Sequence, residues 1–126
     1  MVRITVNRQV GLVAGAAALS WLGEYIHNQI ALPPLTLLSP ANSLVALGAI
    51  LLFLAWWLLP YKRLTITLLL AWGVLNLAWA IVTILPTNSL PFSPEQTLEH
   101  YFAHVIYALA QMPLIVIMAS GMRIKD

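Results

Sequence analysis

Three histidines and one glutamate are the residues of this chain whose types and spacing could do chemistry. Glu24 and His27 lie three residues apart, and His100 and His104 lie four apart. On helices these spacings place each pair on one face or on neighbouring faces. Glu-x-x-His is the spacing of carboxylate-bridged di-iron bundles, and His-x-x-x-His is that of helical zinc sites. Three imidazoles and one carboxylate suit zinc, copper or iron, so the four residues form a candidate metal site.

A tetrapyrrole is the second cofactor that these residues suit. His27 together with His100 or His104 could ligate a haem from two helices, and a single histidine would hold a chlorin. Aromatic and amide side chains would line such a site. We expect these cofactor-binding residues to be Trp72, Asn76, Trp79 and Tyr107.

Two further interpretations need no inorganic cofactor. A small membrane enzyme could use Glu24 as a base and His104 as an acid on a lipophilic substrate of the quinone, sterol or isoprenoid type. Alternatively, the polar residues could be interhelical hydrogen bonds in an accessory subunit of a larger membrane complex. Neither a G-x-S-x-G motif nor a P-loop nor G-x-G-x-x-G is present, so hydrolase, ATPase and dinucleotide chemistry have no support.

The elements that must position these residues are membrane helices. Of the 126 residues, 61% are apolar and 8% are charged, whereas soluble domains carry about 25% charged residues. We predict an all-α, antiparallel four-helix bundle that forms one transmembrane domain over residues 1–126. The expected spans, near the roughly 20 residues that cross a bilayer, are about 10–32, 40–60, 64–85 and 94–122.

Local signals define the expected helix ends and contacts. Ser39 and Ser93 each precede a proline and are expected to cap the second and fourth helices. Gly11 and Gly15 form a small-xxx-small pair that favours close helix approach. The absence of cysteine excludes disulfides and thiolate metal sites.

The basic residues predict the orientation. With four crossings, every Lys and Arg falls on one side of the membrane, and the positive-inside rule then places both termini in the cytoplasm. These residues are Arg3, Arg8, Lys62, Arg63, Arg123 and Lys125. We therefore expect a protein of the bacterial inner membrane that contacts lipid and forms a homo-oligomer or part of a larger complex. Six dispersed basic residues give no reason to expect nucleic-acid binding.

The polar residues fall at matching depths toward the outer side. With a rise of about 1.5 Å per residue, His27 and Glu24 lie about 8 and 12 Å from the outer end of the first helix. His100 and His104 lie about 9 and 15 Å down the fourth helix by the same count. We therefore predict an outward-facing polar site between the first, third and fourth helices that binds a metal ion or a redox or lipid-like cofactor.

Overall fold

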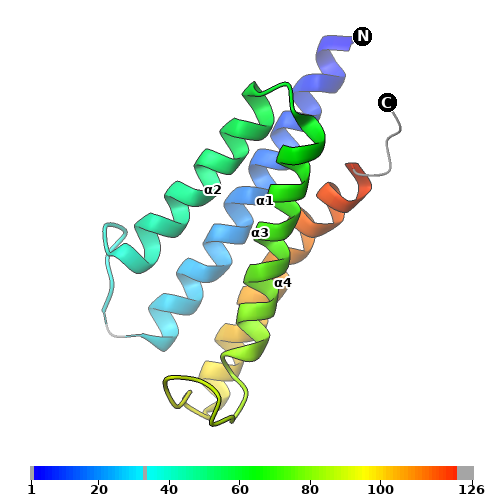
Figure 1. Cartoon of the computed structure of the whole chain (residues 1–126). Helices are drawn as coiled ribbons and strands as arrows, with labels where there is room; N and C mark the ends of the chain where they lie inside the picture. Colours follow the sequence, from blue (N-terminus) through cyan, green and yellow to red (C-terminus); the bar gives the residue numbers. More distant parts are fainter. Residues whose placement is uncertain (1, 33, 122–126) are drawn as a thin grey trace.

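Four α-helices make up the fold, which was obtained as a computed structural model. It describes the backbone of residues 2–32 and 34–121, and the side chains of these residues from position 7 onward. The helices, in chain order, are α1 (Val2–Ala31), α2 (Pro40–Leu58), α3 (Lys62–Val82) and α4 (Leu98–Gly121). Figure 1 shows the α2–α3 turn at the same end as the start of α1, and the α3–α4 connection at the opposite end. The predicted all-α class is confirmed.

Each helix packs against two others. The neighbouring pairs are α1 with α4, α4 with α3, α3 with α2, and α2 with α1. The apolar core lies between them in the half of the molecule that contains the α2–α3 turn. Its buried members are Val13, Ala16, Leu69, Leu114 and Met118. The polar residues occupy the other half, so the core and the candidate site follow one another along the bundle.

The closest helix approach is at Gly23 in α1, and not at the predicted pair. A Cβ placed on Gly23 would overlap Ala110 Cβ of α4, whereas one placed on Gly11 or Gly15 would meet nothing within 4 Å. The small-xxx-small prediction was therefore wrong in its location. Glycine at position 23 lets α1 and α4 approach closely next to the histidines.

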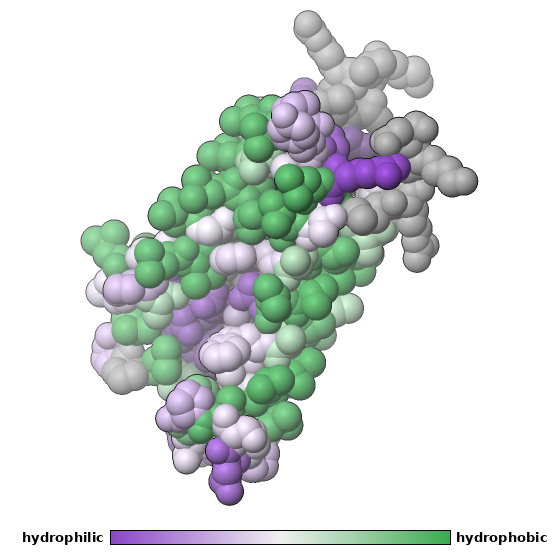
Figure 2. Space-filling view, viewed as in Figure 1, coloured by the Kyte–Doolittle hydropathy of each residue, from purple (hydrophilic) through white to green (hydrophobic). Residues whose placement is uncertain are grey.

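Three of the helices are long and apolar enough to cross a membrane: α2, α3 and α4. Large apolar side chains cover much of the outside, as the predominantly hydrophobic surface in Figure 2 shows. α1 is not among the three, which were found within the part of the chain that the structure describes. The crossing of α1 stays a prediction.

The start of α4 differs from the prediction. The helix begins at Leu98, and the Thr97 hydroxyl oxygen accepts a hydrogen bond from the His100 backbone N–H at 3.2 Å. Thr97 is thus the N-cap, in place of Ser93. Gln96, which precedes this cap, donates through its amide to the carbonyls of Ile84 and Pro94. The capping Thr97 places His100 in the first turn of α4.

Candidate metal centre

The three histidines converge at the end of the bundle that carries the α3–α4 connection. His104 Nε2 lies 2.9 Å from His27 Nε2 and 2.8 Å from His100 Nε2. One ligand nitrogen from each residue lies within 4.8 Å of the other two. His104 is buried, with 5% of its surface exposed, and the other two are half-buried. This cluster could hold a metal ion, as the sequence predicted for the histidines.

The end of α3 orients His104. Its Nδ1 lies 2.6 Å from the Ala80 carbonyl oxygen. A carbonyl only accepts, so Nδ1 must carry the proton. Ala80 is in the last turn of α3, where helical carbonyls lack partners within the helix. Neutral His104 therefore presents the lone pair of Nε2 to the other two histidines.

A relay of asparagine amides orients His27 in the same way. Asn42 Nδ2 donates to the Thr36 carbonyl at 2.9 Å, which turns Asn42 Oδ1 toward Asn28. Asn28 Nδ2 donates to that oxygen at 2.9 Å, so Asn28 Oδ1 faces His27 Nδ1 at 3.1 Å. Because Asn28 Oδ1 accepts, His27 Nδ1 carries its proton, and neutral His27 also presents a lone pair at Nε2.

Two unprotonated Nε2 atoms 2.9 Å apart repel each other unless a proton or a metal ion lies between them. Metal-bound histidines almost always donate their second ring N–H to a carbonyl or carboxylate, and both His27 and His104 do so here. Zinc–nitrogen bonds of about 2.0–2.1 Å in a tetrahedral site separate two nitrogens by about 3.4 Å. Zinc binding thus requires the Nε2 atoms to move apart by about 0.5 Å.

His100 lacks this support. Its Nδ1 is buried, and no hydrogen-bond partner is present among the described residues. Its backbone is held by the Thr97 cap, but no acceptor fixes its ring. His100 is therefore the least constrained of the three candidate ligands.

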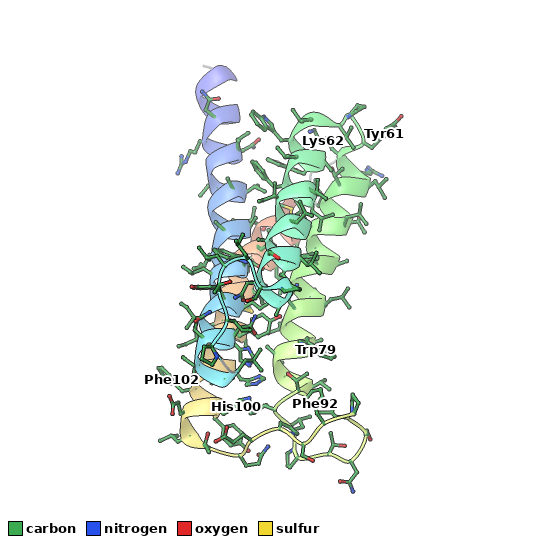
Figure 3. All side chains as sticks on the ribbon, turned by 90° about the vertical axis from the view of Figure 1, so that its left-hand side faces the viewer. Tyr61, Lys62, Trp79, Phe92, His100 and Phe102 are labelled. Atoms are coloured by element: carbon green, nitrogen blue, oxygen red, sulfur yellow. The ribbon has the colours of Figure 1, made fainter. Side chains whose placement is uncertain are left out.

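The histidines line a cavity of about 410 Å³. The ends of α1 and α3 and the connection before α4 form its other walls, with Leu32, Trp79, Phe92 and Glu95 among the lining residues. Figure 3 shows Trp79, Phe92 and His100 at this end, whereas Lys62 lies at the opposite end. Three protein ligands next to a cavity leave room for a further ligand on a bound metal.

Glu24, the fourth predicted metal ligand, does not belong to the converging group. Among the described residues, the group that could hold a metal ion consists of His27, His100 and His104 alone. Glu24 Oε2 is buried with no hydrogen-bond partner among the described residues. Its roles as a metal ligand or as a catalytic base stay predictions.

The four predicted cofactor-binding residues separate into different environments. Tyr107 donates to Asn76 Oδ1 at 2.6 Å, and the Tyr107 ring lies 5.4 Å from the His27 ring. Trp79 lines the cavity. Trp72 points toward α2, where its Cζ3 atom would be 3.1 Å from a Cβ on Gly48. Trp72 therefore packs between helices rather than against the histidines.

The geometry does not favour a haem ligated by His27 together with His104, whereas ligation by His27 with His100 stays a prediction. Two axial nitrogens at about 2 Å from one iron lie about 4 Å apart on opposite faces of the macrocycle. His27 and His104 have their Nε2 atoms 2.9 Å apart, which leaves no space for a ring between them. His104 also uses both ring nitrogens within the protein, so its predicted role as a catalytic acid finds no support in this arrangement.

Several supporting residues were missed by sequence reasoning. Asn42 is 1% exposed and belongs to α2, which was expected to carry no part of the site. Its only sequence signal is an asparagine early in an apolar helix. The hydrogen bond from His104 to Ala80 leaves no signal in the sequence, since its acceptor is a backbone carbonyl. Ser20 and Gln111 form a further buried pair, in which the Ser20 hydroxyl donates to Gln111 Oε1.

Comparison with known proteins adds no relatives. The chain matches no protein-family model, no curated protein and no solved structure at a significant level. Function must therefore be inferred from the site itself.

Proposed function

We propose that this protein is an integral membrane metal-binding protein in which His27, His100 and His104 hold one divalent transition-metal ion. The observation that carries the proposal is the pair of hydrogen bonds that place a proton on Nδ1 of His27 and of His104, whose Nε2 atoms then lie 2.9 Å apart. Imidazole ligands suit zinc, copper and iron, and three nitrogens with one open position suit zinc best.

Helix dipoles support a cation at this position. The carboxyl ends of α1 and α3 lie next to the cluster and carry partial negative charge, which stabilises cations. The amino end of α4 lies near His100 and acts in the opposite sense. The nearby acid Glu95, which lines the same cavity, adds negative charge to the cavity wall.

The proposal includes the membrane arrangement. We infer an antiparallel bundle with four crossings and with both termini in the cytoplasm, so that the metal centre lies toward the outer surface. Because the chain has no cysteine, single cysteines report the topology. Asn88→Cys in the α3–α4 connection should react with an impermeant maleimide added outside cells, and Lys62→Cys should not. The reverse labelling pattern would overturn this orientation.

Metal content tests the function. Protein purified without chelator and then incubated with zinc should retain about one ion per chain, measured by elemental analysis after gel filtration. Cobalt should give the intense visible absorption of a low-symmetry four-coordinate site. His104→Ala should lose both signals.

A matched control separates ligand loss from general damage. Gln29 is exposed and close to His27 in sequence, and its side chain donates to the Leu35 carbonyl. Gln29→Ala should therefore bind zinc like the natural sequence. Unchanged zinc binding in His104→Ala, with helical circular dichroism retained, would refute the proposed centre.

A further inference from the structure

The cavity at the metal centre is open next to its exposed lining residues Leu32 and Trp79. Figure 2 shows hydrophilic residues at the floor of a hollow in the lower half of the molecule, between the α2 and α3 sides seen in Figure 1. Apolar side chains surround it. Leu32 and Trp79, which line the cavity, have 43% and 55% of their surfaces exposed. In a membrane, this opening faces lipid.

The connection between α3 and α4 lies on the expected water side of the same cavity. Residues Phe92 to Glu95 of the α3–α4 connection form part of the cavity wall. Gln96 connects this segment to its neighbours through two hydrogen bonds. Its amide donates to the Ile84 carbonyl at 3.0 Å, and its oxygen accepts from the Tyr101 hydroxyl. On the water side, a ligand thus meets a connection that the hydrogen bonds of Gln96 hold in place. On the lipid side, it meets the exposed side chain of Trp79.

The cavity wall contains two aromatic side chains, Trp79 and Phe92. Trp79 comes from α3 and Phe92 from the connection, and both line the cavity while remaining 55% and 44% exposed. Figure 3 places them at the same end of the molecule as His100. Exposed aromatic faces beside a cavity favour a flat ring, which gains from offset or edge contacts. The volume of about 410 Å³ is in the range that holds one small-molecule head group.

We propose that the cavity binds the ring of a membrane-soluble quinol or quinone, whose oxygen takes the open coordination position of the metal. The ring contacts Trp79 and Phe92, and the isoprenoid or alkyl tail extends through the opening next to Leu32 into the bilayer. This inference rests on the proposed metal centre and adds the class of its ligand and the direction of entry. It concerns binding alone.

The experiment uses the full chain in phospholipid nanodiscs, loaded with cobalt. Adding decylubiquinol should change the visible cobalt spectrum saturably, because an oxygen donor enters the coordination sphere. Trp79→Ala should weaken this binding by about two- to tenfold and leave cobalt affinity unchanged. Trp57 is similarly exposed, at 49%, but lies near the end of α2 away from the cavity, so Trp57→Ala should bind decylubiquinol normally.

The outcomes distinguish the two proposals. If cobalt does not bind the natural sequence, the metal centre fails and the ligand inference fails with it. If cobalt binds but decylubiquinol leaves its spectrum unchanged, the ligand inference alone is refuted. A spectral change caused by decanoate and not by decylubiquinol would assign the cavity to fatty acids and would also overturn it. Equal effects of Trp79→Ala and Trp57→Ala would refute the assigned ring contact.

Discussion

The amide relay from α2 to His27 predicts a metal defect in a variant that retains every metal ligand. Asn28 is 5% exposed, and among the described residues its oxygen is the partner that fixes the protonated Nδ1 of His27. Asn28→Leu keeps a side chain of similar size but removes that acceptor. Loss of such an outer-shell partner typically costs 10- to 100-fold in metal affinity, which corresponds to about 1.4–2.7 kcal/mol of binding free energy. One ligand of three is affected, so we expect the lower half of this range.

Competition titration of zinc against a chromophoric chelator measures the effect. Asn42→Leu, one step further from His27, should weaken zinc binding less, because Asn28 Oδ1 still reaches the ring. Asn76→Leu is the matched control, since its oxygen accepts from Tyr107 and not from a histidine. Its zinc affinity should stay within about twofold of the natural value. Zinc affinity unchanged in Asn28→Leu would refute the tautomer argument, even if the variant were less stable to heat.

Three further predictions concern stability, measured by thermal unfolding in detergent. Thr97→Val should lower the free energy of unfolding by about 1 kcal/mol, because it deletes the α4 cap. Ser93→Ala should change the free energy of unfolding by less than about 0.5 kcal/mol. The opposite order would restore Ser93 as the cap. Gly23→Ala should cost about 1–3 kcal/mol by overpacking against α4, while Gly15→Ala, in open space, should be neutral or stabilising. Zinc at 100 times its dissociation constant should stabilise the fold by about 2.7 kcal/mol, and excess chelator should abolish that gain; a melting temperature insensitive to zinc would contradict a bound ion.

The sequence revealed the fold class and the histidines because both signals are local. Long apolar runs predict helices by composition alone, and the structure contains three that could cross a membrane. His100 and His104 lie close together however the helices pack, since both residues are on α4 at i, i+4 spacing. His27 could be added because its depth along α1 is set by the same helical rise.

The relative depths were predicted less well. Counting from Pro94 placed His104 about 15 Å deep, nearer to the level of Glu24 than to that of His27. In the structure His104 contacts His27 and Ala80, about one turn away from that expectation. The later start of α4 at Leu98 changes the reference point of the count. Which turn of one helix meets which turn of another depends on tilt and on close contacts such as the one at Gly23, and neither is a local signal.

The polar residues at this end of the bundle are better explained by their hydrogen bonds to the histidines than by a contribution to stability. Buried amides and histidines in a membrane protein contribute little to stability, since interhelical hydrogen bonds there average about 0.6 kcal/mol. Apolar packing of the kind seen around Leu69 and Leu114 would stabilise α1 against α4 without such groups. Asn42, Asn28 and His27 instead form a directed relay that begins at a backbone carbonyl and ends with one lone pair. A second, independent contact from α3 sets the lone pair of His104. Contacts from separate helices therefore favour the same tautomer in two neighbouring histidine rings. Without a cation, the unprotonated Nε2 atoms of these rings repel each other, and a cation between them removes this repulsion.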